Sequence, residues 1–394
     1  MKIAGIICEY NPFHKGHKFQ IQKIKEKGYS HIVCVMSPNF VQRGDIAIYE
    51  KRKRANLALL NGADLVLELP TPYALSSSGQ FSYGAVAILN ALGCVDSLCF
   101  GGENDDKPLF LETANCLENI KTSPSLKLYL DQGLSYQNAV MKCLMENYNK
   151  ESYELLQGAN NLLGVDYIRQ IKALNSKMDI EIIKREGELH DGNELSLLFQ
   201  SGSAIRNVIK SSCLENALNF MPKNAKEILE NEKPSFIEGL EQLIMFRLKT
   251  METNDFLSYA DVSEGLEYRF EKAIRENSSS ADIINFVKSK RYTHSRIRRI
   301  VLNSLLDIDK SLAKKHPPYI RVLGFNDKGA EIIRLAKKSS NLPISHNLKK
   351  LSEVSEDARD LARLEAKATD VFYLCNNAPM PKGIEYKAKP IILR

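Results

Sequence analysis

An apolar run that ends in a turn and two closely spaced histidines opens this chain, and it constrains the fold more than any other segment. Residues 3–8 are almost all aliphatic, as in a strand buried on both faces of a parallel sheet. Residues 9–13 form a Pro-containing turn, and His14-Lys15-Gly16-His17 begins an amphipathic helix. The order strand, turn, helix is typical of the first βα unit of a doubly wound sheet, where the turn binds phosphate.

His14 and His17 are candidate phosphate ligands. Side chains at positions i and i+3 of a helix lie on one face, and a helix N-terminus offers free N–H groups and a partial positive charge. The two imidazoles would add donors to an anion site, which suits attack on the α-phosphate of a nucleotide. Gly16 would let the backbone approach the nucleotide. A lone His-x-Gly-His also occurs by chance, so the position after the first strand is what favours catalysis.

Strand and helix patterns alternate through the first half of the chain. Strands are predicted at residues 2–8, 31–36, 65–69, 97–100 and 180–183, and helices at 17–27, 51–61, 77–92, 135–147 and 160–173. From residue 211 to about 315 the pattern is mainly helical; after it, 319–324 and 371–375 are predicted as strands and 328–338 as a helix. We therefore predict an α/β protein: a Rossmann-like parallel-sheet domain over residues 1–215, then a largely α-helical domain with a small α/β terminal part over 216–394.

Cysteine usage and hydropathy indicate a cytoplasmic protein. The eight cysteines form no Cys-x-x-Cys pair, and Cys8, Cys34 and Cys99 lie in apolar strand-like runs. They are expected to be reduced core residues, neither metal ligands nor a disulfide framework. No apolar run reaches the ~18 residues of a membrane-spanning helix, and no signal-peptide pattern precedes the first strand.

The positive charge is concentrated in one part of the sequence. The chain carries a net charge of +6, while residues 286–350 carry +12 and the remainder therefore −6. Tyrosine and histidine are interleaved with the cations, which favours a nucleic acid partner over an ordinary solvated helical face. The candidate tRNA-contacting residues in this segment are Lys290, Arg291, Tyr292, Arg296, Arg298 and Arg299.

Several stretches resemble one known family. Residues 14–17 resemble the HxGH signature of the nucleotidyltransferase α/β-phosphodiesterase superfamily, which has a HUP-type Rossmann-like fold. The longer run of residues 9–17, Glu-Tyr-Asn-Pro-Phe-His-Lys-Gly-His, resembles the tRNA(Met) cytidine acetate ligases within it. Residues 201–206 resemble the S-S-T-x-I-R helix start, 159–164 the P-N-N-I-L-G stretch, 100–103 the F-G-S-E turn and 290–296 the K-R-Y-T-x-[ST]-R segment.

The resemblance implies a set of ATP contacts, with His14 and His17 as the catalytic pair. Ser203, expected as a helix N-cap, and Arg206 would hold the β- and γ-phosphates. The alternative for Ser203 and Arg206 is an ordinary capped helix with a surface arginine. Asn160 and Asn161 could serve only to cap a helix, and Arg185 could be a surface residue beyond a strand. The implied ATP-binding residues are Ile7, Glu9, Tyr10, Asn11, Pro12, Phe13, His14, Gly16, His17, Gln20, Gly101, Asn160, Asn161, Arg185, Ser203 and Arg206.

Two more cationic features belong to family-like stretches. Arg43, in Asn39–Asp45, is expected to face the leaving pyrophosphate. The cluster Lys51-Arg52-Lys53-Arg54 is expected on a surface helix, with tRNA phosphates as an alternative role.

The implied reaction forms N4-acetylcytidine at the wobble position of elongator tRNA(Met). Acetate would attack the α-phosphate of ATP to give acetyl-adenylate and pyrophosphate, and the cytidine amine would then take the acetyl group and release AMP. ATP is the implied cosubstrate, and Mg²⁺ is its usual companion, although the sequence offers no evident carboxylate pair for Mg²⁺ and no evident general base for the amine. The alternative is an adenylyl- or cytidylyltransferase acting on a small metabolite, against which the basic segment argues. A tRNA-binding protein without catalysis conflicts with the two phosphate motifs.

Overall fold

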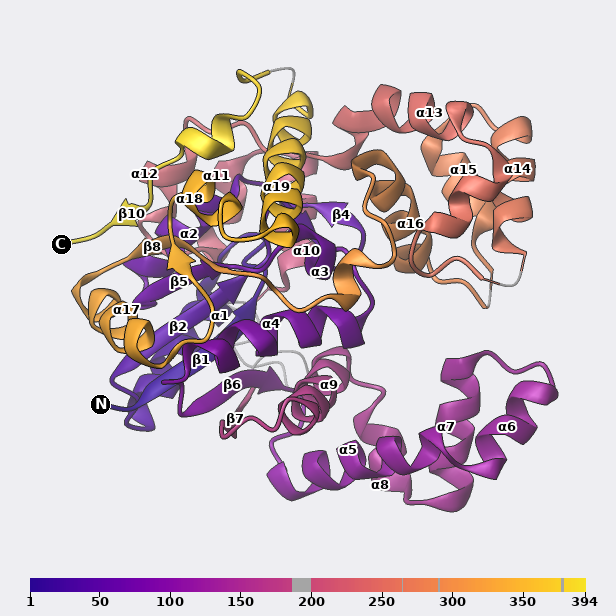
Figure 1. The fold of residues 1–394 in the computed structure, drawn as a ribbon, viewed down its shortest axis with the longest axis horizontal. Coiled ribbons are helices and arrows are strands. Elements are labelled where there is room, and N and C mark those ends of the chain that lie inside the picture. The colour runs from indigo at the N-terminus through magenta and orange to yellow at the C-terminus, as the bar shows by residue number, and fades with distance from the viewer. Residues whose placement is uncertain (186–199, 264, 290, 377–378) are drawn as a thin grey trace.

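The computed structural model describes residues 1–185, 200–263, 265–289, 291–376 and 379–394. Its centre is one sheet with the strand order β10-β8-β5-β2-β1-β6-β7, and β9 pairs with β8 (Figure 1). A separate short hairpin, β3-β4, follows β2. The strands are β1 (Ile3–Cys8), β2 (His31–Met36), β3 (Phe40–Val41), β4 (Asp45–Ile46), β5 (Leu65–Glu68), β6 (Ser97–Gly102), β7 (Asp179–Lys184), β8 (Ile320–Phe325), β9 (Ile344–Ser345) and β10 (Ile391–Ile392).

The first five long strands form the doubly wound arrangement that the alternating pattern predicts. β1 pairs in parallel with β2 on one side and with β6 on the other, and β5 and β7 extend the sheet outward. Every residue of β2 and β5 is buried, which explains why both strands are apolar except for His31 at the start of β2 and Glu68 at the end of β5. The strand order reverses at β1, because β2 and β5 are added on one side of it and β6 and β7 on the other. Ligands bind at this switch point in such folds.

Helices cover both faces of the sheet and extend beyond it. The prediction of helices in the first half is confirmed, and three further helices lie between residues 107 and 155. The α-helices of the first half are α1 (Lys15–Glu26), α2 (Lys51–Leu60), α3 (Thr71–Ala74), α4 (Ser78–Leu92), α5 (Lys107–Lys121), α6 (Pro124–Asp131), α7 (Tyr136–Asn147), α8 (Lys150–Leu155) and α9 (Ala159–Ala173).

The second half is mainly helical, as predicted. Its α-helices are α10 (Gly202–Ser211), α11 (Leu214–Ala217), α12 (Ala225–Leu229), α13 (Glu241–Thr250), α14 (Leu266–Glu276), α15 (Ser280–Val287), α16 (His294–Leu306), α17 (Asp327–Ser339), α18 (Leu348–Ser352) and α19 (Glu356–Leu374). Short 3₁₀ turns are η2 (Leu218–Phe220), η3 (Ile237–Leu240), η4 (Thr253–Ser258), η5 (Leu312–Lys314) and η6 (Ile384–Lys387). Two groups of helices, α5–α8 and α13–α16, project from the same side of the sheet (Figure 1).

The C-terminal part of the chain returns to the first sheet. β8 pairs antiparallel with β5, with Leu65 opposite Phe325, and β10 pairs with β8. Segments from both sides of the predicted division at residue 215 therefore share one sheet. This pairing is long-range in sequence, so a local hydropathy pattern carries no sign of it.

The prediction that the cationic run Lys51–Arg54 lies on a surface helix is wrong for Lys51 and Arg54. Lys51 and Arg54 are fully buried. Lys51 forms ion pairs with Glu68 and Glu385, and Arg321 of β8 pairs with the same two carboxylates. This buried ion-pair network joins α2, β5, β8 and η6, so these cations hold the C-terminal segment against the sheet.

The predicted strand at 371–375 is also wrong, because its residues end helix α19 and follow it. Val371, Phe372 and Tyr373 are β-branched or aromatic, which favours a strand locally. However, Leu361, Ala368 and Phe372 continue a buried stripe at helical spacing along α19, and packing of that stripe determines the conformation.

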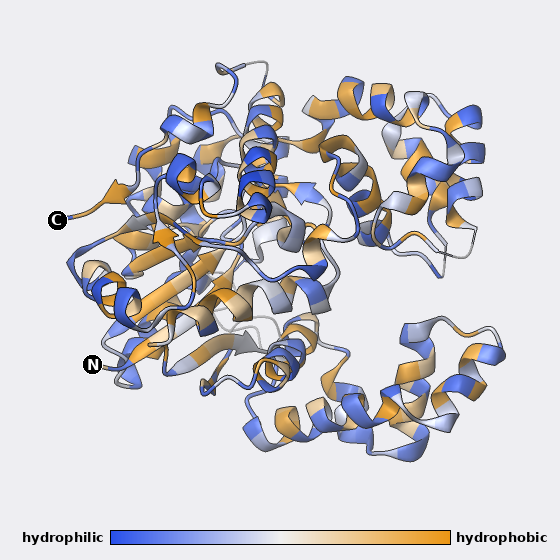
Figure 2. Cartoon of the chain, viewed as in Figure 1, coloured by the Kyte–Doolittle hydropathy of each residue, from blue (hydrophilic) through white to orange (hydrophobic). Residues whose placement is uncertain are grey.

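The distribution of hydropathy agrees with this architecture. Figure 2 shows the strands of the central sheet as predominantly hydrophobic, while α17 and α19 alternate between hydrophobic and hydrophilic residues. Among the described residues, no helix is both long enough and apolar enough to cross a membrane.

Candidate active site

A cavity of about 360 Å³ lies beyond the carboxyl ends of β1 and β6, at the switch point of the sheet. Its wall is built from seven separate segments: the β1–α1 turn, the loop after β3, the start of α4, the end of β6, the first half of α9, the end of β7 and the start of α10. A narrower extension runs past His14 and His17 towards Lys184 and Ser201. The polar residues that follow different strands are thus brought together at one edge of the sheet.

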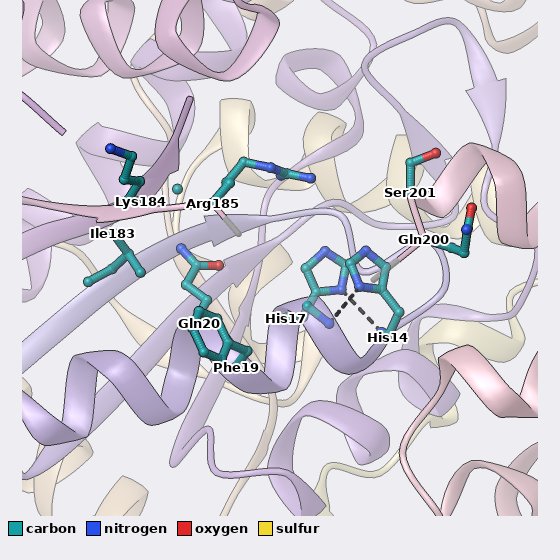
Figure 3. Close-up of a pocket in the computed structure, with 11 residues that line it drawn as sticks. His14, His17, Phe19, Gln20, Ile183, Lys184, Arg185, Gln200 and Ser201 are labelled. Carbon is teal, nitrogen blue, oxygen red and sulfur yellow. Dashed lines mark hydrogen bonds between the residues drawn. The ribbon is translucent and has the colours of Figure 1, made fainter. Parts of the chain in front are cut away.

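His14 and His17 lie side by side at the N-terminus of α1. Their rings stack with centroids 3.6 Å apart, and Figure 3 shows Arg185 reaching towards them from the end of β7. His14 is the N-cap of the helix, and its Nδ1 accepts a hydrogen bond of 3.1 Å from the backbone N–H of Gly16. The Nδ1 of His17 accepts one of 3.2 Å from the backbone N–H of His14.

These bonds determine the protonation state of both rings. An imidazole nitrogen that accepts a hydrogen bond carries no proton, so each neutral ring has its proton on Nε2. Burial lowers the pKa of His14 to about 3 and that of His17 well below its usual range, and the nearby Arg185 adds to both effects. The pair therefore offers two neutral Nε2–H donors beside a helix N-terminus, an arrangement suited to phosphoryl oxygens.

Arg206 ties α10 to the histidine turn. Its Nη1 donates a hydrogen bond of 2.7 Å to the backbone carbonyl of Asn11, and its Nη2 donates one of 3.1 Å to Ser203 Oγ. The prediction that Ser203 is the N-cap of this helix is wrong. Ser201 is the N-cap, and its hydroxyl accepts a hydrogen bond from the backbone N–H of Ala204, whereas Ser203 lies within the first turn. Both hydroxyls line the cavity.

The end of β6 is fastened to the start of α9 by reciprocal hydrogen bonds. The Glu103 carboxylate accepts from the backbone N–H groups of Asn160 and Asn161 and from Asn160 Nδ2. Asn161 Oδ1 in turn accepts from the backbone N–H groups of Glu103 and Asn104. Asn160 and Gly101 line the cavity, while Asn161 is buried in this junction.

Most residues that the sequence indicates for ATP surround this cavity or its extension. Those that do are Ile7, Glu9, Tyr10, Asn11, His14, Gly16, His17, Gln20, Gly101, Asn160, Arg185, Ser203 and Arg206. Pro12, Phe13 and Asn161 do not line it. Phe13 is fully buried and its ring contacts those of Tyr10 and His17, so it supports the turn from behind.

Some lining residues were missed by sequence reasoning. Gln42, Glu103, Tyr167 and Ser201 all contribute to the wall, as does the expected Arg43. Glu103 belongs to residues 100–103, which resemble the F-G-S-E turn. Its carboxylate caps α9, more than fifty residues further along the chain, and no local sequence pattern indicates that contact. Tyr167 lies in the middle of α9, where an aromatic residue at helical spacing predicts only packing.

The cavity offers Mg²⁺ few protein ligands. Among the residues that the structure describes, the acidic ones in its lining are Glu9 and Glu103, and both oxygens of Glu103 already accept hydrogen bonds from α9. Among the described residues, no three His, Cys, Asp or Glu side chains are grouped as metal ligands. The described lining residues therefore do not fit a metal centre held by the protein alone.

The predicted tRNA-contacting segment lies on α16 and the turn before it. Tyr292, expected to stack on a base, is buried in the core, with the Arg296 guanidinium 4.9 Å above its ring. Arg296 donates to the backbone carbonyl of Asp261, and Arg299 is buried in an ion pair of 2.7 Å with the Asp261 carboxylate. Arg298 is half-buried, Arg291 is exposed, and Lys290 lies outside the described residues.

Helix α16 contacts the wall of the cavity through Gly44. A Cβ on Gly44 would lie 2.6 Å from Arg298 Cβ and 2.6 Å from the backbone nitrogen of Arg299, so only glycine allows this approach, and its φ is +70°. Arg43 and Gln42, which precede it, line the cavity. The site and the basic helix are thus neighbours.

The remaining cations of the basic segment do not share this surface. Arg321 is buried in β8, within the sheet, and Lys337 and Lys338 lie on α17, at the other side of the sheet from α16 (Figure 1). The cations of residues 286–350 are therefore spread over several elements, which include α16, η5, β8, α17 and α18.

Comparisons with known proteins agree with this arrangement. A family model described as HIGH Nucleotidyl Transferase matches residues 1–386. A tRNA(Met) cytidine acetate ligase of Thermoanaerobacter sp. (strain X514) is 39% identical over 98% of both chains. One from Clostridium kluyveri is 38% identical over 100% of this chain and 99% of that one. The crystal structure of Thermotoga maritima TmcAL bound with α-thio-ATP superposes with a TM-score of 0.91 at 33% identity, and each chain is covered completely.

Proposed function

This chain belongs to the tRNA(Met) cytidine acetate ligase family of HIGH nucleotidyl transferases, and from that premise we propose that it acetylates N4 of the wobble cytidine of elongator tRNA(Met), with acetate and ATP as its other substrates. The relatives support a ligase and do not support the alternative of a transferase acting on a small metabolite. Since tRNA is the proposed substrate, we expect the protein in the cytoplasm.

The observation that carries the proposal is the histidine pair. Both Nδ1 atoms accept backbone hydrogen bonds, so both Nε2–H groups are available to the cavity. In the first step an acetate oxygen attacks the α-phosphorus of ATP and pyrophosphate leaves. His14 and His17 donate to the α-phosphoryl oxygens, where negative charge increases in the transition state. Acetate is itself the nucleophile, so no serine or cysteine is required.

The other cavity residues would position the nucleotide. Gly101, Asn160 and Arg185 would hold the nucleoside and the α-phosphate, and Arg206 with Ser203 would hold the β- and γ-phosphates. All five residues line the cavity. Arg43 is exposed at the edge of the cavity, where it would face the leaving pyrophosphate. Mg²⁺, if it takes part, would be held mainly by the triphosphate.

For tRNA we propose the surface formed by α16 and the tip of the β3-β4 hairpin. Gly44 brings Arg298 next to the loop that carries Arg43, so one strand of phosphates would pass both arginines and present a base to the cavity. Residues 216–394 would then supply most tRNA contacts, and residues 1–215 the ATP site.

The test is incubation of purified protein with ATP, ¹³C-acetate and total tRNA, followed by nuclease digestion and nucleoside mass spectrometry. We expect the label in N4-acetylcytidine, lost with His14→Ala and His17→Ala and retained with Glu26→Gln, an exposed residue on the same helix. Labelled acetyl-adenylate without labelled tRNA would restrict the function to the first step. ATP turnover that does not depend on acetate would contradict the proposal.

A further inference from the structure

Glu9 follows β1 directly and lines the cavity beside the histidine turn. Its backbone carbonyl accepts a hydrogen bond from Arg54 Nη1, and its Oε1 accepts one of 2.8 Å from the backbone N–H of Gln42. No described residue donates a hydrogen bond to Oε2. The carboxylate is therefore held through one oxygen while the other remains available to a molecule in the cavity.

The second step of the proposed reaction needs a proton acceptor. When N4 of cytidine bonds to the acetyl carbon, the nitrogen must lose a proton. The histidines cannot accept it, because Nδ1 of each is occupied by a backbone N–H and Nε2 already carries a proton. Burial raises the pKa of the Cys8 thiol and of the Tyr167 phenol, so both keep their protons.

The remaining carboxylate in the cavity wall is already engaged. Glu103 accepts hydrogen bonds through both oxygens from α9, so a proton there would break the junction that holds β6 to that helix. Among the described lining residues, Glu9 is thus the carboxylate with a free oxygen.

We propose that Glu9 is the general base of acetyl transfer, an inference that rests on the proposed function. The N4–C bond forms, the bond between the acetyl carbon and the phosphate oxygen breaks, the N4 proton passes to Glu9 Oε2, and AMP leaves. A carboxylate at this place would also select an acceptor that has an N–H to give, as the exocyclic amine of cytidine does.

The charges around Glu9 suit this role. Arg206 from α10, Arg43 from the hairpin loop and Arg54 from α2 face it, and Tyr167 faces it from α9. Burial raises the pKa of the carboxyl above its usual range, and the three guanidinium groups oppose that rise. A base whose pKa is raised accepts a proton more readily, while the nearby cations favour its ionised form before transfer.

The two half-reactions separate this role from ATP binding. Glu9→Gln keeps an oxygen that accepts from Gln42 N but removes the basic site. We expect transfer from synthetic acetyl-adenylate to tRNA(Met) to fall about 100-fold to 10,000-fold, and to fall at least about tenfold more than acetate-dependent ATP–pyrophosphate exchange. Glu9→Asp should restore part of the transfer rate.

A pH profile provides a test that needs no stable Glu9→Gln protein. The wild-type transfer rate should decline at acidic pH as Glu9 becomes protonated, and this acidic limb should be absent from the exchange reaction. An acidic limb of equal size in the exchange reaction would overturn the inference, as would equal losses of exchange and transfer in Glu9→Gln. Failure of the proposed function would look different, because the wild-type protein itself would then form no N4-acetylcytidine.

Discussion

The Nδ1 atom of His17 lies 3.2 Å from the backbone nitrogen of His14 and accepts its hydrogen bond. The same helix end uses His14 Nδ1 to bind Gly16 N, so each histidine both caps the helix and presents Nε2–H to the cavity. One nitrogen of each ring is thus structural and the other is available for chemistry. A substitution that keeps the acceptor at the position of Nδ1 and removes the donor at the position of Nε2 can therefore separate the structural role from the chemical one.

His17→Asn should lose activity without losing stability. The asparagine oxygen can accept the bond from His14 N, but no donor remains at the position of Nε2. We expect ATP–pyrophosphate exchange to fall about 100-fold to 1,000-fold, the usual effect of removing one donor to a developing oxyanion. His17→Ala should lose similar activity and, in addition, about 0.5–2 kcal/mol of stability with the cap. Urea unfolding of both variants checks this, and equal stability losses would contradict the division of roles.

The low pKa of His14 predicts acid sensitivity. Its folded value of about 3 lies below the ordinary 6.5, so the unfolded chain binds the proton more tightly. The stabilisation is complete above about pH 6.5 and is lost as the pH falls towards 3, by up to about 1.4 kcal/mol for each pH unit. Free energies of unfolding measured at pH 7.5 and 5 should therefore differ less in His14→Asn than in the wild type. An unchanged difference would show that His14 titrates normally.

The sequence predicts the parallel half of the fold well, because each buried strand and its following helix carry their own periodic signal. It cannot predict that β8 pairs with β5, since that contact joins residues some 255 positions apart and depends on the partners of Arg321. Lys51 shows the same limit. In the sequence it is part of a cationic run, and only the three-dimensional position of Glu68 and Glu385 makes it a core residue.

The buried ion-pair network should be essential for stability. Glu68→Gln leaves Lys51 and Arg321 buried with one anion fewer, and breaking such a pair costs about 3–5 kcal/mol. The exposed pair of Lys23 and Glu26 is the matched control, and Glu26→Gln should cost at most about 1 kcal/mol. Thermal and urea unfolding measure both. A loss below about 1 kcal/mol for Glu68→Gln would mean that the network contributes little to joining the C-terminal segment to the sheet.

Neighbouring arginines of α16 should differ in their effects. Arg298→Ala should weaken tRNA binding and lower the slope of log K against log salt by about 1, with little change in stability. Arg299→Ala should instead destabilise the fold, because it leaves Asp261 without its buried partner. Filter binding at several salt concentrations, together with unfolding curves, distinguishes them. Loss of tRNA affinity in Arg299→Ala at full stability would contradict this assignment.

The sequence indicates the candidate site best where the residues that form it are close together in the chain. His14, Gly16 and His17 belong to one turn, and Arg206 lies one turn beyond Ser203, so each motif already contains its own geometry. Tyr292 was misjudged because an aromatic residue among cations matches both a stacking platform and a core residue covered by Arg296. The difference depends on which side of the turn faces solvent, and the sequence does not specify it.

Gly44→Ala tests whether contact with α16 positions the catalytic loop. The added Cβ would lie 2.6 Å from the backbone nitrogen of Arg299, so the loop must move away from α16, and with it Gln42, whose N–H holds Glu9. Misplacing a catalytic group by about 1 Å can cost 100-fold, so we expect transfer to tRNA to fall at least about tenfold more than ATP–pyrophosphate exchange. Gly28→Ala is the matched control, because Gly28 also has a positive φ, +87°, but a Cβ there meets nothing within 4 Å. The control should lose only the strain of its backbone, about 1–2 kcal/mol, and keep the wild-type ratio of the two activities. If both variants keep that ratio, the position of Glu9 does not depend on the contact between Gly44 and α16.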